Sequence, residues 1–321
     1  MTMADESDMF ATGLKTGGPT GKTGGPTGTG TTGGPTGTTG GPTGEGGAAP
    51  APGLATGIMR IFDLSIGQML WSRRTVFMGL VVAAPMALAL LYRVLHASFG
   101  DPEVNGQAVR GTTLFGMTIW LLYLRFIVPI LGVFYGTALV ADEVDDKTIT
   151  YLFVRPIARR AVLLGKYLAY LASTVCVVLP SVMVVYFLTT AFDLRVIAES
   201  FPALAKDLGL LGAGLAVYGA VFAFVGTRLK HPLVLGLVFA FGWEQFALFI
   251  PGYLRRFTVV YYLQALVPHA MPQDSAMSML QAVFRQTPSA LECLGWLALI
   301  WAGFLVLAAR TIEHREYVLE Q

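Results

Sequence analysis

The sequence predicts an all-α, polytopic membrane protein with six transmembrane helices and an interfacial amphipathic helix before the first of them. Of its 321 residues, 54% are hydrophobic and only 13% are charged, and the mean hydropathy is +0.62. Soluble domains usually carry about a quarter charged residues. Much of the surface must therefore face lipid, and a net charge of +2 gives no support to a nucleic-acid partner.

Six apolar segments account for the predicted spans, because a bilayer core of about 30 Å needs about 20 helical residues. The second and the fifth each hold one charged residue, Arg125 and Glu244. An even number of crossings places both termini on the same side of the membrane. The six segments are 75–92, 111–141, 167–192, 208–227, 231–252 and 293–309.

Basic residues are unequally divided between the two sides of this predicted topology. Positive residues favour the cytoplasmic side, so we expect both termini to be cytoplasmic. Twelve basic residues lie on the side of the termini: Arg60, Arg73, Arg74, Lys147, Arg155, Arg159, Arg160, Lys166, Arg228, Lys230, Arg310 and Arg315. Seven lie on the other side: Arg93, Arg110, Arg195, Lys206, Arg255, Arg256 and Arg285.

Two stretches flank the spans with mixed apolar and polar residues. On a helical wheel of residues 56–74, one face carries Ile58, Ile61, Phe62, Ile66 and Met69, and the opposite face carries Arg60, Asp63, Gly67 and Arg74. Such a helix suits a membrane interface, and an N-terminal extension of the first span is the alternative. The outward loop at 253–288 combines tyrosines, arginines and prolines, which fits an interfacial aromatic belt or a substrate gate.

The N-terminal region differs in composition from the rest. Residues 1–54 are predicted to form a disordered Gly/Thr/Pro-rich cytoplasmic tail, because they lack the large apolar side chains that a core needs. Residues 55–312 then form the transmembrane domain, and 313–321 a cytoplasmic C-terminal tail. The stretch 17–23 is similar to a phosphate-binding loop, but Thr16 occupies the first glycine position and no strand precedes it. We therefore expect no ATPase site in this chain.

The cytoplasmic segment 141–160 has the features of a short amphipathic helix that lies parallel to the membrane. Its acidic start favours a helix N-terminus. An apolar stripe of Ile149, Leu152 and Phe153 follows, and Pro156 discourages helix at Arg155. An ordinary positive-inside loop is the alternative interpretation.

The residues of this segment resemble the signature region of type-2 ABC exporter permeases. The matching positions are Glu143, Thr148-Ile149, Leu152, Arg155-Pro156-Ile157, Arg159 and Gly165-Lys166. Lys147 departs from the pattern, which has glycine there. The resemblance covers residues 56–312 and includes a Leu-Gln-x-Leu-x-Pro stretch at 263–268.

The resemblance implies a permease subunit in the bacterial inner membrane that exports its cargo with a separate ABC ATPase subunit. The partner ATPase would bind ATP, and this chain would bind no cofactor. A second permease copy or a sister permease would complete the membrane part. The segment 141–160 would act as the cytoplasmic coupling helix, with Glu143, Thr148, Phe153, Arg155, Pro156 and Arg159 as its coupling residues. Lipid-like or amphiphilic cargo is favoured over sugars, and some family members instead support assembly or metal-cofactor maturation.

Three other classes of function are alternatives to a permease subunit. An intramembrane enzyme or metal site is not supported, because the four histidines are far apart in the sequence and no H-E-x-x-H or G-x-S-x-G motif occurs. An ATPase-independent secondary transporter could use Arg125 and Glu244 as an ion site. A non-transporting scaffold that holds an ATPase-driven machine at the membrane is the third.

Arg125 and Glu244 are predicted to lie close together inside the protein. Charged residues at mid-bilayer cost about 2.5–3.5 kcal/mol each on insertion scales, so each needs a partner or water. Both are expected in the outer half of the bilayer. The alternative is that each separately lines a wet cavity or extends toward the interface.

Overall fold

The computed structural model describes residues 53–100, 103–104, 107–108, 111–140, 159–190, 194–247, 253–267 and 288–314. All of these belong to one unit, Pro50–Gln321. The described part is helical apart from two antiparallel strands of two residues each, β1 (Glu103–Val104) and β2 (Gln107–Ala108). The predicted all-α class is confirmed for this part of the chain. The predicted coupling helix lies outside the described residues, except for its last two positions.

The amphipathic stretch forms helix α1 (Leu54–Leu70), which is separate from the helix that follows, α2 (Arg73–Phe99). Trp71 and Ser72 lie between the two helices and are not helical. The Ser72 hydroxyl donates a hydrogen bond to the Met69 carbonyl at 3.1 Å. The predicted apolar face packs against α7 (Arg159–Thr189), with Ile61 buried in the contact. The position of α1 at a membrane surface stays a prediction.

Within the described ranges, five helical segments are long and apolar enough to cross a membrane, where the sequence predicted six. They are Arg74–Phe99, Gly111–Val140, Arg159–Thr189, Ile197–Arg228 and Ala290–His314. The fifth predicted segment, 231–252, contains a shorter apolar helix, Pro232–Ala247. At about 1.5 Å per residue this described part is about 24 Å long, and residues 248–252 of the segment lie outside the described residues.

Before an α-helical turn at 137–140, the second span consists of four helical pieces of different winding. They are α3 (Gly111–Met117), the π-helix η1 (Thr118–Ile127), α4 (Val128–Leu131) and the π-helix η2 (Gly132–Gly136). Pro129 lies between the π-helices and has no N–H to donate to the carbonyl of Arg125, four residues earlier. The short fifth helix is also mixed: α9 (Pro232–Leu237), the π-helix η3 (Val238–Trp243) and α10 (Glu244–Ala247). π-Helical turns often mark functional positions.

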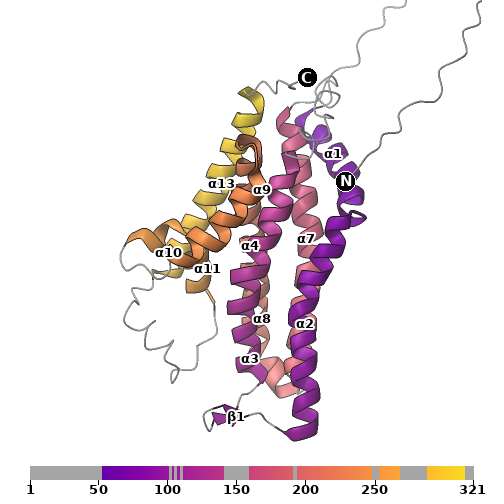
Figure 1. Cartoon of the computed structure of the whole chain (residues 1–321), viewed down its shortest axis with the longest axis vertical. Coiled ribbons are helices and arrows are strands. Elements are labelled where there is room, and N and C mark those ends of the chain that lie inside the picture. The colour runs from indigo at the N-terminus through magenta and orange to yellow at the C-terminus, as the bar shows by residue number, and fades with distance from the viewer. Residues whose placement is uncertain are drawn as a thin grey trace, which may run out of the picture. The chain divides into compact units, whose positions relative to one another are not determined.

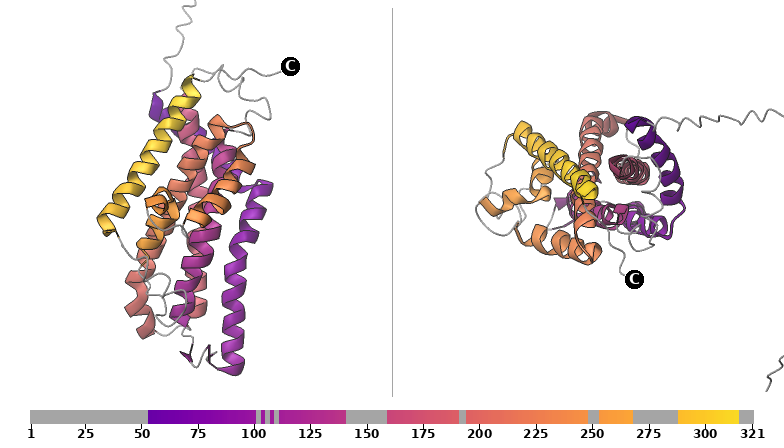
Figure 2. Two further views of the ribbon diagram at one scale, coloured as in Figure 1. Left: turned by 60° about the vertical axis from the view of Figure 1, so that its left-hand side comes forward. Right: turned by 90° about the horizontal axis from the view of Figure 1, so that it is seen from above.

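Helix α8 (Leu194–Arg228) is the centre of the bundle. It contacts α7, α9, α11, α13 and the helical pieces of the second span. Figure 2 shows the long helices of this bundle from two further directions. Gly226 permits one of these contacts, because a Cβ there would lie 2.5 Å from the Thr137 carbonyl oxygen.

The predicted outward loop begins as helix and not as loop. A 3-10 turn, η4 (Tyr253–Phe257), leads into α11 (Val259–Ala265), and Val260 and Leu263 are fully buried. Helix α11 contacts α8, η1 and the last helix, α13 (Ala290–His314). Figure 1 shows α10 and α11 at mid-height of the long helices. The first part of the stretch therefore packs into the bundle, which corrects the loop expectation.

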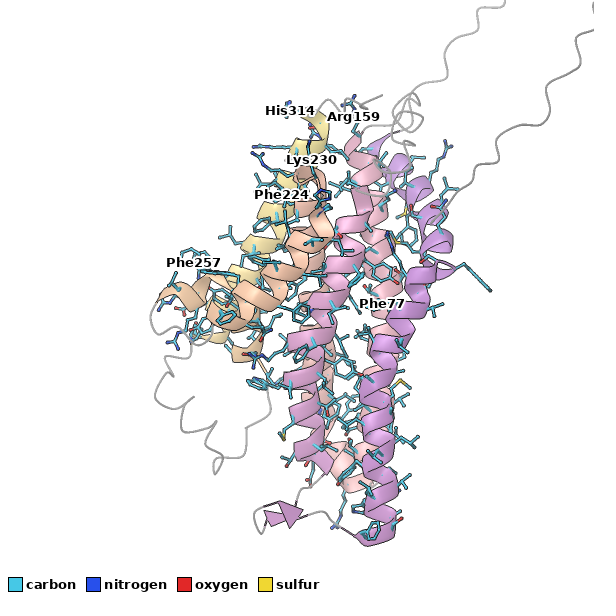
Figure 3. The ribbon with its side chains drawn as sticks, viewed as in Figure 1. Phe77, Arg159, Phe224, Lys230, Phe257 and His314 are labelled. Atoms are coloured by element: carbon cyan, nitrogen blue, oxygen red, sulfur yellow. The ribbon has the colours of Figure 1, made fainter. Side chains whose placement is uncertain are left out.

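The ends of several helices meet at one end of the bundle. Arg159, Lys230 and His314 lie there together (Figure 3), whereas β1 lies at the opposite end (Figure 1). We call the end with Arg159, Lys230 and His314 the basic end. Its composition agrees with the predicted grouping of the loops on the side of the termini.

Candidate functional site

The predicted coupling residues Glu143, Thr148, Phe153, Arg155 and Pro156 lie outside the described residues, whereas Arg159 opens α7. Arg159 donates from Nη1 to the Glu313 carbonyl at 3.4 Å. Arg160 forms an ion pair with the Glu313 carboxylate. The first turn of α7 is therefore attached to the last turn of α13 at the basic end.

Gly165 explains a second contact of α7 near the basic end. A Cβ at this position would lie 2.7 Å from the Ile61 Cβ and 2.8 Å from the Ile58 carbonyl oxygen of α1. These distances are shorter than real Cβ contacts allow, so only glycine permits α1 to pack this closely on α7. This close packing explains the glycine of the Gly165-Lys166 pair, which is part of the sequence resemblance.

The intramembrane Glu244 joins three helices through its carboxylate. Its side chain is fully buried at the start of α10. One carboxylate oxygen accepts a hydrogen bond from the Tyr218 hydroxyl of α8. The other accepts from the Val259 N–H, at the start of α11, at 3.1 Å. Both oxygens therefore have donors in a site without access to water, and Glu244 fixes α11 to the core.

Arg125 lies on η1 and contacts the residue after Glu244. Its Nε and Nη2 donate to Oε1 of Gln245 at 2.9 and 2.6 Å, respectively. Gln245 in turn donates from Nε2 to the Arg125 carbonyl at 3.4 Å, which is the carbonyl that Pro129 leaves without its α-helical donor. The guanidinium also lies 5.4 Å from the centre of the Trp120 ring, within the range of a cation–π contact.

Arg125 and Glu244 were predicted to lie close together, and among the described residues Arg125 bonds to the neighbouring Gln245, with no ion pair to Glu244 itself. The predicted contact between the helices that carry the two residues is present, because η1 and α10 meet there. The partner is Gln245, since consecutive helical residues point in different directions and only one of the two can face the second span. Arg125 also lies deeper than predicted, with 14 residues before it and 15 after it in the span Gly111–Val140. It is at the middle of this span and not in its outer part.

Sequence reasoning missed Gln245, Tyr218 and Trp120 as members of this polar site. Pro129 was the available signal, because a proline inside a span frees the carbonyl four residues earlier for another donor. The approach of Trp120 to Arg125 was not predictable from α-helical spacing. It arises in a π-helix, whose i→i+5 hydrogen bonds bring residues five apart to nearly the same side.

Long apolar helices packed around buried polar contacts at mid-span define a multi-pass membrane protein. The chain belongs to the ABC-2 family of transporter proteins, whose family model matches residues 42–315. No curated protein matches the chain. The family match confirms the resemblance to type-2 ABC permeases, and this chain is a membrane permease component of an ABC transporter.

Proposed function

We propose that this protein is the permease subunit of an ATP-driven exporter, whose cargo crosses the membrane when a separate ATPase subunit hydrolyses ATP. The match of the ABC-2 family model to residues 42–315 carries the proposal. The ATPase binds ATP and docks at the basic end through residues 141–160. A second permease copy, or a sister permease, completes the membrane part. The protein lies in the bacterial inner membrane with both termini in the cytoplasm.

The contacts of α7 support this route for force. The proposed docking segment leads directly into α7, whose first turn bonds to Glu313 through Arg159 and Arg160. Helix α7 also packs against α1, α2 and α8. A displacement of 141–158 would therefore reach four other helices through one rigid element.

The coupling role of 141–160 is tested by replacing Phe153 and Arg155 together with alanine. Aromatic and arginine side chains dominate interface energies, with losses of about 2 kcal/mol or more at the best positions, which is about a 30-fold weaker affinity. We expect weaker retention of the ATPase in pull-down experiments and loss of ATP-dependent transport in vesicles. Expression and thermal stability of the permease should stay at wild-type levels.

A matched control removes the same two residue types elsewhere. Arg256 and Phe257 lie in η4, and Figure 3 places Phe257 away from the basic end. Their double alanine variant should keep wild-type ATPase binding. Equal binding by both double variants would overturn the docking assignment. Transport without any ATPase would favour a secondary transporter, and ATPase binding without transport of any cargo would favour a scaffold.

A further inference from the structure

The cation of Arg125 has no anionic partner among the described residues. Its guanidinium bonds to the neutral amide of Gln245 and lies over the neutral ring of Trp120. The adjacent carboxylate of Glu244 is already occupied by Tyr218 and the Val259 N–H. A full positive charge is thus held at the middle of a span without charge compensation from the described protein.

The same guanidinium keeps donors available for a ligand. Arginine has five N–H donors, and the two hydrogen bonds to Gln245 use one at Nε and one at Nη2. Both N–H groups of Nη1 and one of Nη2 are left, and the side chain is partly exposed. Gln245 holds both ends of the residue, since it also donates to the Arg125 carbonyl. The arginine fork is therefore oriented before any ligand binds.

Large apolar residues neighbour Arg125 and Gln245 in the sequence of both helices. Phe126 stacks with Phe241 at 5.9 Å between ring centres, which joins the two π-helices next to the Arg125–Gln245 contact. Four of these side chains are exposed: Leu121 and Phe126 on the second span, and Trp243 and Phe246 on the helix Pro232–Ala247. A ligand that fits this surface has an anionic group for the arginine and a hydrocarbon part for its neighbours.

We propose that Arg125 binds the anionic head group, a phosphate or a carboxylate, of an amphiphile that passes along the second span and the short helix Pro232–Ala247. This proposal rests on the exporter function proposed above and names the chemistry of its cargo. An anionic head group meets its highest energy at mid-bilayer, for the same reason that a charged side chain does. A fixed guanidinium there lowers that energy, because it offers charge-assisted and bidentate hydrogen bonds to planar or tetrahedral oxyanions.

Direct binding to the full-length permease in a zwitterionic detergent tests the site. The probes are a short-chain phosphatidylglycerol, a phosphatidylcholine with the same chains, oleate and inorganic phosphate. Loss of hydrogen bonds to a charged group is expected to weaken phosphatidylglycerol binding about tenfold or more in Arg125→Gln, and to remove its preference over phosphatidylcholine. The control Arg60→Gln removes one charge from the exposed face of α1 and should bind like the wild type.

The four probes separate the sources of the anion. Oleate binding that depends on Arg125 extends the site to carboxylate head groups and supports the proposal. Inorganic phosphate that binds as tightly as phosphatidylglycerol would overturn it, because the apolar surroundings would then contribute nothing. An unchanged phosphatidylglycerol preference in Arg125→Gln would overturn it as well.

A second variant keeps the test valid where Arg125→Gln does not fold. Arg125→Lys retains the charge but replaces the planar fork by a point charge, so its phosphatidylglycerol binding should fall severalfold. Wild-type affinity in a folded Arg125→Lys protein would show that the planar fork is not needed and would overturn the proposed bidentate recognition. ATPase retention by the wild type reports on the proposed function separately, since it does not involve lipid binding.

Discussion

At the scale of single residues, Glu244 shows how a charged side chain is accommodated within the bundle. Its two oxygens accept from donors on two different elements, the Tyr218 hydroxyl of α8 and the Val259 N–H of α11. Removal of one partner from a buried hydrogen bond leaves the other unsatisfied, at a cost of about 1–3 kcal/mol. The described contacts of Glu244 therefore give it a structural role, the attachment of α11 to the bundle.

Glu244→Ala should lower the free energy of unfolding by about 1–3 kcal/mol or more, because it leaves both donors without an acceptor. Glu244→Gln should cost less. Its amide oxygen can accept from the Val259 N–H, and its NH₂ group can donate to the Tyr218 oxygen. Thermal unfolding of the purified protein measures both effects. Glu199→Ala, at an exposed position on α8, is the control, and an equal loss in Glu244→Ala and Glu199→Ala would contradict the attachment role.

At the scale of elements, the contact of α1 with α7 depends on one glycine. Gly165→Ala places a methyl group 2.7 Å from the Ile61 Cβ and 2.8 Å from the Ile58 carbonyl oxygen. Overpacking of this kind usually costs about 1–3 kcal/mol. We expect a lower melting temperature and faster proteolysis within α1, since α1 must move away from α7.

The matched control for this contact is Gly67→Ala in α1 itself. A Cβ at Gly67 meets nothing within 4 Å, and alanine favours helix over glycine by about 1 kcal/mol. This variant should be as stable as the wild type or more stable. Proteolysis of α1 at the wild-type rate in Gly165→Ala would show that the contact tolerates a side chain.

At the scale of the whole transmembrane unit, the orientation in the membrane is the remaining prediction. Lys230 and His314 lie at the basic end, and β1, which contains Val104, lies at the opposite end. The excess of positive residues predicts that the basic end is cytoplasmic. In intact cells, a membrane-impermeant maleimide should therefore label Val104→Cys and leave Lys230→Cys and His314→Cys unlabelled.

The labelling needs a background without the native thiols, because Cys176 is exposed. Alanine at Cys176 and Cys293 provides it. Permeabilised cells should give labelling of all three introduced cysteines, which controls for their reactivity. Labelling of Lys230→Cys but not of Val104→Cys in intact cells would reverse the proposed orientation.

The sequence by itself determined the class of protein and most of its helices. Runs without charge predict spans, because a charged side chain in lipid is costly whatever its neighbours are. The signature residues from Glu143 to Lys166 identified the family, which the match to residues 42–315 confirms. The roles of Phe153, Arg155 and the other coupling residues stay predictions, since most of that segment lies outside the described residues.

Only the tertiary structure decided which groups meet inside the bundle. Arg125 bonds to Gln245 and not to Glu244. Two adjacent residues of α10 point in different directions, so only one of them can face the second span. The start of α11 is held in the core by Glu244, which accepts a hydrogen bond from the Val259 N–H. Hydropathy measures the transfer of each residue into lipid, and it carries no information on hydrogen-bond partners far away in the chain. Those partners, set by packing, determined the surroundings of Arg125 and of Glu244.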